Sequence, residues 1–173
     1  METIELIIPE EWQHLYSSPS KVVRWPDPRL RNVARKVTKF NKALYNRADA
    51  MRKVMMANGG VGLAAPQLGI DKQIIVVKEG VGLPTVMINP IVTQEEGEIL
   101  SSSEGCLSLP KLRGDVVRSN FVNFSYRDLQ NKLYHMTTGG YGAIVLLHEI
   151  DHLNGILFVD KAVPGSLKWS TRN

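Results

Sequence analysis

Two histidines four residues apart, His148 and His152, form the pattern in this sequence that most directly predicts chemistry. No glycine or proline interrupts residues 143–154 and most of them are apolar, so the run predicts a buried helix that ends at Gly155. Residues four apart lie on one helical face, about 5 to 6 Å from each other, so both imidazoles can bind one metal ion. Glu149 lies about 100° further around the helix, where a base beside a bound water belongs.

The same motif also has a purely structural explanation, because H-E-x-x-H arises by chance in chains that bind no metal. Burying two imidazoles and two carboxylates costs desolvation energy, however, and a cation would offset that cost. Cys106, the single cysteine, is the candidate third ligand, because a thiolate binds Fe(II) or Zn(II) and three ligands leave a position for water. The alternatives for Cys106 are an inert buried thiol and a nucleophile paired with a histidine.

Two further stretches hold groups suited to stabilising negative charge. A glycine and a proline flank the segment around Cys106 and fix an irregular backbone path, so the Leu107 amide could point at a developing oxyanion. Residues 60–67 read Gly-Val-Gly-Leu-Ala-Ala-Pro-Gln, whose small side chains would let another backbone approach closely, while Gln67 offers an amide donor. No Lys-Ser/Thr pair follows, which excludes a phosphate loop, but a tight, well-packed turn is a second interpretation.

Composition excludes several other classes of protein. The chain has 173 residues, 43% apolar and 22% charged, which predicts one soluble catalytic domain over residues 1–173, with an N-terminal extension at 1–20 and a short tail at 164–173. A net charge of +4 is too slight to indicate nucleic acid or a membrane surface as a partner, and no apolar run is long enough to span a bilayer. One cysteine and the absence of a targeting signal predict a cytoplasmic protein.

The hydrophobic pattern predicts an α+β fold, with mostly antiparallel sheets surrounding the buried central helix that carries the H-E-x-D-H motif. A first long helix is predicted over residues 40–57, with its methionines as core packing. Pro90 is expected at a sheet edge or bulge. Near the N-terminus, an edge strand over residues 4–8 and a short helix over residues 9–16 are both compatible with the sequence. The predicted strands cover residues 73–78, 86–92, 95–100, 116–126 and 133–136.

The three chemically suggestive stretches together resemble peptide deformylase, the metalloenzyme family that removes the N-formyl group from nascent polypeptides. The family signatures G-x-G-L-A-A-P-Q, E-G-C-L-S and H-E-x-D-H occur in this order at residues 60–67, 104–108 and 148–152. The resemblance runs from about residue 22 to 161. It therefore covers most of the chain and includes every candidate metal ligand and catalytic residue named above.

Carried over to this sequence, the resemblance implies that Cys106 and the two motif histidines bind one divalent metal ion, with Fe(II) favoured and Zn(II) or Ni(II) as alternatives. It implies that Glu149 is the general base and acid, and that Gln67 and the Leu107 amide bind the oxyanion. The expected reaction is hydrolysis of the formamide of N-formylated nascent peptides. The metal lowers the pKa of its bound water, Glu149 takes the proton, and hydroxide attacks the formyl carbon to release formate.

The substrate is expected to bind through its methionine side chain and its backbone. Ile144 and Val145 lie four and three residues before His148, on the face of this ligand, so we expect them in the methionine pocket. The resemblance adds Val61 and Tyr141 as neighbours, and the small-residue stretch should pair with the peptide backbone. The predicted substrate-binding residues are Gly60, Val61, Gly62, Tyr141, Ile144 and Val145.

Three charged residues are predicted to support the ligands from behind. We expect Asp151 to act with Arg118 as its partner, and Glu104 to orient a ligand histidine. The sequence departs from the family at Leu147, where many members have Gln. It also ends 21 residues after His152, so the longer C-terminal helix with which family members dock on the ribosome is reduced, and we expect only a weak ribosome contact.

Two rival classes stay open on the sequence alone. A zinc-dependent peptidase that cleaves unformylated peptides would carry the same helix, but it normally recruits a third His or Glu downstream. The residues after His152 include Asp160 and no His or Glu. A closed structural metal site in a non-enzymatic domain would need a fourth protein ligand, and the chain has no second cysteine.

Overall fold

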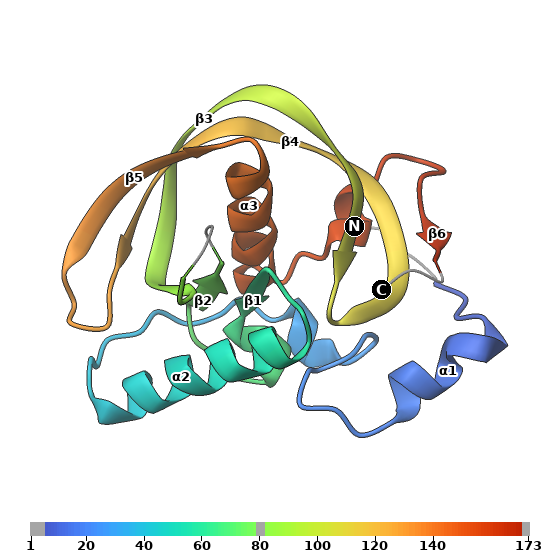
Figure 1. Cartoon of the computed structure of the whole chain (residues 1–173), viewed down its shortest axis with the longest axis horizontal. Helices are drawn as coiled ribbons and strands as arrows, with labels where there is room; N and C mark the ends of the chain where they lie inside the picture. Colours follow the sequence, from blue (N-terminus) through green and yellow to red (C-terminus); the bar gives the residue numbers. More distant parts are fainter. Residues whose placement is uncertain (1–5, 79–81, 171–173) are drawn as a thin grey trace.

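A curved antiparallel sheet surrounds one central helix in the computed structural model, which describes residues 6–78 and 82–170 (Figure 1). Within these residues the sheet has six strands in the order β1-β2-β3-β4-β5, and β6 pairs with β4. The strands are β1 Gly62–Ala64, β2 Ile74–Val77, β3 Thr85–Cys106, β4 Leu109–Arg127, β5 Leu133–Gly139 and β6 Lys168–Trp169. The α-helices are α1 Glu10–Ser17, α2 Lys42–Ala57 and α3 Tyr141–Leu153. The predicted α+β class and its central helix are confirmed.

Helix α3 is the predicted motif helix, and it ends as the sequence indicates. Asn154 caps it and Gly155 follows with φ 70°, a left-handed conformation that favours glycine. The helix begins earlier than the predicted run, so that Gly142 lies inside its first turn. A Cβ at Gly142 would overlap the hydroxyl of Thr138 on β5, so glycine allows the helix to start against the sheet.

The long hairpin of β3 and β4 arches over α3 (Figure 1). Two predicted strands, 86–92 and 95–100, are parts of the single strand β3, because Thr93 and Gln94 between them are exposed but continue the strand instead of forming a loop. The register shifts between Ile88 and Ile91, so Pro90 lies in a bulge as predicted. At its far end the hairpin pairs Cys106 with Leu109. The only thiol is therefore carried at a tight strand connection.

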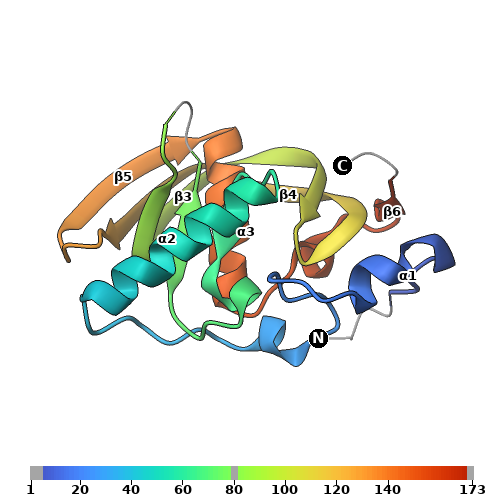
Figure 2. The ribbon, with the colours of Figure 1, turned by 60° about the horizontal axis from the view of Figure 1, so that its bottom comes forward.

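Helix α2 packs across β1 and β2 on the side away from the arch (Figure 2). It confirms the predicted first helix, but it begins at Lys42 because the Asn41 side chain accepts a hydrogen bond from the Leu44 amide at 3.1 Å. Met51 and Met55 are buried in the core beneath it, as expected for packing residues. No helix in the described part of the chain is long and apolar enough to cross a membrane.

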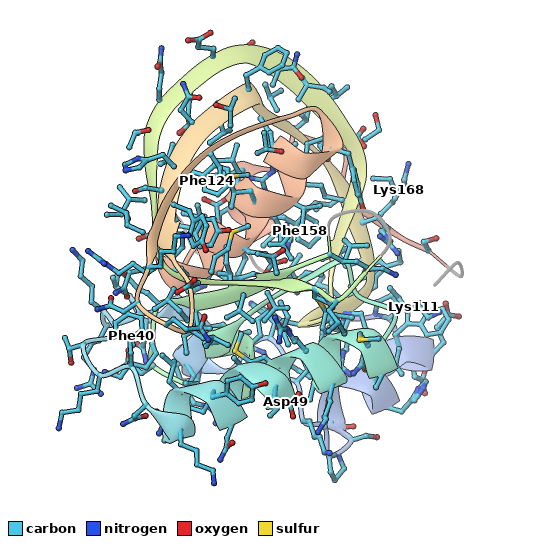
Figure 3. All side chains as sticks on the ribbon, turned by 60° about the vertical axis from the view of Figure 1, so that its left-hand side comes forward. Phe40, Asp49, Lys111, Phe124, Phe158 and Lys168 are labelled. Carbon is cyan, nitrogen blue, oxygen red and sulfur yellow. The ribbon has the colours of Figure 1, made fainter. Side chains whose placement is uncertain are left out.

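Of the two alternatives near the N-terminus, the structure contains the helix, α1. The strand alternative, residues 4–8, lies partly outside the described residues, and residues 6–9 form no regular element. The Tyr16 hydroxyl on α1 donates to the Pro110 carbonyl at 2.9 Å, which attaches the helix to the start of β4. Figure 3 shows Phe124 and Phe158 in the interior near α3, whereas Asp49 and Lys168 lie at the periphery.

Candidate metal centre

Three possible ligands converge where α3 passes the connection between β3 and β4. The Sγ atom of Cys106 lies 3.2 Å from Nε2 of His152, and the ligand atoms of Cys106, His148 and His152 all lie within 4.8 Å of one another. The two imidazole rings have centroids 5.0 Å apart and planes inclined by 78°. Metal–nitrogen and metal–sulfur bonds of about 2.0 to 2.3 Å allow one ion to bridge donors at this spacing.

The donor set is chemically suited to a cation. Nδ1 of His148 lies 3.0 Å from a Glu104 oxygen, an arrangement that fixes the tautomer and leaves Nε2 available as a ligand. Burial raises the pKa of Cys106, but the neighbouring charges of His152 and His148 outweigh burial and lower the pKa well below its ordinary value. The thiolate, which is the ligand form, is therefore favoured. The three residues fit a divalent ion and leave room for a further ligand.

Glu149 lies beside this cluster as a buried and incompletely paired carboxylate. It is 4% exposed, and its Oε2 atom has no hydrogen-bond partner within the described residues. Burial raises the pKa of Glu149 to about 7, although nearby His148 and His152 oppose the rise. A carboxyl group with this pKa is suited to exchange protons near neutrality.

Glycine at position 62 makes room for this carboxylate. A Cβ at Gly62 would overlap Oε1 of Glu149, and a Cβ at Gly60 would lie 3.2 Å from the side chains of Leu107 and Met55. Within the protein, side chains approach these two glycines most closely, and the expected approach of a peptide backbone stays a prediction. Glycine at position 62 is therefore a requirement of the site itself.

Gln67 is positioned by its own backbone neighbourhood. The Ala64 amide donates to Oε1 of Gln67 at 2.8 Å, which orients the side-chain amide with Nε2 towards the thiol. Nε2 lies 3.3 Å from Sγ of Cys106 and 3.3 Å from the Ser108 hydroxyl. The structure therefore places a buried amide donor directly beside the metal ligands.

A cavity of about 560 Å³ opens onto the cluster. Its volume is in the range that accommodates drug-sized ligands. Tyr141, which is 65% exposed, and the exposed Val61 contribute to its walls. The predicted residues that line it are Gly60, Val61, Gly62, Gln67, Glu104, Cys106, Leu107, Tyr141, Ile144, Val145, His148 and Glu149. The sequence analysis missed Leu15, Arg24 and Arg113, which also line it, because isolated residues in different segments carry no spacing signal.

An ion-pair network centred on Arg118 joins strand β3 to helix α3. Nε and Nη2 of Arg118 donate to Glu104 at 2.6 and 2.9 Å, and Nη1 donates to Asp151 at 2.9 Å. Burial raises the pKa of Glu104, but hydrogen bonds from Arg118 and His148 outweigh burial and lower it to about 2. Lys161, which sequence reasoning missed, donates to Asp151 at 2.6 Å. Glu104 is thus held as a carboxylate against the ligand histidine.

The fold and the site together define a mononuclear metallohydrolase: one thiolate, two imidazoles on a helix, and an adjacent buried carboxylate facing an open cavity. The chain belongs to the polypeptide deformylase family, whose model matches residues 19–167. It is accordingly a metalloenzyme with peptide deformylase activity, and Cys106, His148 and His152 form its metal site. This membership separates the chain from the peptidase and the structural site that the sequence left open.

Individual relatives agree with the family match. A peptide deformylase from Pelotomaculum thermopropionicum is 44% identical over 142 residues, which cover 82% of this chain and 90% of the relative. The crystal structure of peptide deformylase from Thermotoga maritima superposes with a TM-score of 0.80 at 36% identity, covering 83% of this chain and 97% of that one. Peptide deformylase 1B, chloroplastic/mitochondrial, from Arabidopsis thaliana is 35% identical over 84% of this chain and 55% of its own length.

Proposed function

We propose that Glu149 is the general base and then the general acid in hydrolysis of the formyl group. Cys106, His148 and His152 would hold the divalent cation, which supplies Lewis-acid activation of water. Glu149 takes a proton from the attacking water and returns it to the departing amine, leaving formate and a free amino terminus. The observation that carries this assignment is the buried Glu149 carboxylate next to the ligands: its Oε2 atom has no hydrogen-bond partner in residues 6–78 and 82–170, and its pKa is about 7.

We propose that Gln67 and the Leu107 amide stabilise the negative charge that develops on the formyl oxygen. The Gln67 amide is fixed by Ala64 and faces Cys106, so it needs no reorganisation during the reaction. Leu107 follows Cys106 directly and lines the same cavity. In comparable sites one such donor lowers the activation barrier by about 3 kcal/mol.

We propose that the substrate is a peptide with an N-terminal formyl-methionine. The methionine side chain would lie against Ile144 and Val145, which line the cavity one turn before His148. Strand β1 ends the sheet order in the described residues, so its outer edge can pair with an extended peptide near Gly60 and Gly62. A misfit of one methylene would cost only about 1 to 3 kcal/mol, so related apolar side chains should be accepted.

We propose Fe(II) as the native metal, a cytoplasmic location and only a weak ribosome contact. Two nitrogens and one sulfur suit Fe(II) and Zn(II) alike, and the family resemblance favours iron. The location rests on the use of a single cysteine. Activity of anaerobic preparations loaded with Fe(II), Ni(II) or Zn(II) tests the metal, and cosedimentation with ribosomes at several salt concentrations tests the contact.

A direct assay of the proposed substrate class compares formyl-Met-Ala with the unformylated peptide Met-Ala-Ala. We expect stoichiometric release of formate from the first and no cleavage of the second. Replacing methionine by alanine in the formylated peptide should lower kcat/KM, since the side chain would leave the walls formed by Ile144 and Val145. Cleavage of Met-Ala-Ala, or equal kcat/KM for the two formylated peptides, would contradict the proposed specificity.

A further inference from the structure

The backbone of residues 23–25 connects two segments that contact the metal ligand Cys106. The Val23 amide donates to the Gln67 carbonyl at 2.7 Å, and the Trp25 amide donates to the Ser108 carbonyl at 3.0 Å. The segment therefore holds in register two stretches that lie far apart in the sequence. Its middle residue, Arg24, also lines the cavity.

Arg24 is linked to the thiol through a single peptide unit. Its Nη1 atom donates to the Leu107 carbonyl at 2.6 Å. The other end of that peptide unit, the Ser108 amide, donates to Sγ of Cys106 at 3.4 Å. Because the peptide bond has partial double-bond character, a cation at the carbonyl oxygen makes the amide hydrogen more positive. Hydrogen bonds coupled in this way strengthen one another by about 10 to 30%.

No carboxylate of the described residues 6–78 and 82–170 forms an ion pair with Arg24. Its Nη2 atom lies 3.4 Å from the Ser20 hydroxyl, and its Nε atom is buried without an acceptor in the described residues. A partly buried guanidinium without an anionic partner is unfavourable unless nearby negative charge compensates it. Burial lowers the pKa of Arg24, and electrostatic interactions with Tyr16 and Cys106 counteract this effect. The Cys106 thiolate, joined to Arg24 by the two hydrogen bonds of the Leu107–Ser108 peptide unit, can provide part of that compensation.

We propose that Arg24 is a positioning residue that stabilises the Cys106 thiolate through the Leu107–Ser108 peptide unit and thereby limits electron donation from sulfur to the bound cation. Hydrogen bonds to a ligand sulfur are one means by which proteins tune a metal centre. The inference concerns the donor Cys106, and it does not depend on the oxyanion role proposed for Leu107. Removing Arg24 should make the sulfur a stronger donor.

The test uses the Co(II)-loaded protein, in which the sulfur-to-cobalt charge-transfer band reports the electron richness of the thiolate. In Arg24→Met, which removes both the charge and the donor, the band should move to lower energy. Arg24→Gln keeps a neutral donor and should show a smaller shift, whereas Arg24→Lys keeps the charge and should move back towards wild type. Arg35→Met, which removes an exposed cation paired with Asp71, is the control and should leave the band in place.

Activity of the Fe(II) protein gives an independent readout. Arg24→Met should lose up to about tenfold in kcat with little change in KM for formyl-Met-Ala, since outer contacts of metal sites have effects of this order or larger. An unshifted band in the Met and Gln variants would overturn the proposal, as would a raised KM with an unshifted band, which would make Arg24 a substrate contact. Should Arg24→Met fail to fold, the band shift in Arg24→Gln tests the proposal. Gln can still donate to the Leu107 carbonyl, so this variant keeps the structural contact and loses only the charge.

Discussion

Two carboxylates flank the ligand His148, and their surroundings differ sharply. Glu104, on the hairpin, is 8% exposed, has partners on both oxygens, and has its pKa lowered to about 2. Glu149, on α3, is buried to a similar degree, lacks a partner for Oε2 among the described residues, and has its pKa raised to about 7. Opposite pKa shifts in neighbouring acids favour separate tasks: we expect Glu104 to orient the ligand His148 and Glu149 to move protons.

The two pKa values differ because the two carboxylates have different neighbours. We call the side of α3 that carries the Arg118 ion pairs the back of the helix and the side that faces the cavity its front. Behind the helix, Arg118 bridges Glu104 and Asp151, and Lys161 extends the network to the surface. In front, Gly62 leaves space for Glu149 and supplies no charge. The Glu104 carboxylate is therefore fully engaged in ion pairs, while the Glu149 carboxylate keeps an oxygen available to substrate or water.

The largest effect should come from removing one of the three metal ligands. Cys106→Ala leaves both acids in place but removes the sulfur donor, so we expect loss of bound metal and of formate release to near background. Metal analysis after gel filtration and the formyl-Met-Ala assay measure the two effects. Full metal content with wild-type turnover in this variant would contradict the assigned site.

A steric change at Gly62 should disturb Glu149 selectively. In Gly62→Ala the new methyl group would overlap Oε1 of Glu149, so the carboxylate must move. A displacement of about 1 Å can cost about a hundredfold in rate, and we expect a loss of that order in kcat with metal retained. Gly60→Ala, whose Cβ would meet Leu107 and Met55, should cost much less. Similar losses of kcat in the two variants would contradict the specific role of Gly62 in making room for Glu149.

Neutralising Glu104 should lower both the stability of the protein and its affinity for the metal. Glu104→Gln removes one of the two ion pairs of the buried Arg118 that the described residues contain, leaving Asp151, and weakens the contact to His148. Breaking a buried ion pair costs about 3 to 5 kcal/mol, and losing an outer contact of a ligand histidine costs about 10- to 100-fold in metal affinity. Urea unfolding of the metal-free protein and competitive metal titration separate these effects. Unchanged metal affinity would count against the holding role.

The smallest effect is expected at the exposed end of the network. Lys161 is 43% exposed at its side chain, so its ion pair with Asp151 is worth less than about 1 kcal/mol. Lys161→Met should therefore change kcat less than twofold, whereas Asp151→Asn, which removes the negative charge that faces Arg118, should have a larger effect. Measurements of kcat and metal affinity in both variants test this ranking. A larger effect in Lys161→Met than in Asp151→Asn would contradict it.

The sequence could predict the ligands because their signals are local. The spacing of His148 and His152 places both on one helical face, and a single cysteine leaves one choice of sulfur. The contacts of Arg24 and Lys161 could not be predicted, because they depend on how distant segments meet. The length of β3 was missed for a related reason: its polar middle section pairs along β4 with bulges, which local pattern does not reveal.

The most direct test of the account replaces Glu149 by Gln, which preserves shape and removes the carboxylate. Under anaerobic conditions, wild type and Glu149→Gln are compared for bound metal and for formate release from formyl-Met-Ala. We predict full metal content in both proteins and a loss of about 100- to 10,000-fold in kcat for the variant, the range typical of a missing general base. Wild-type turnover by the metal-loaded variant would contradict the assignment of Glu149.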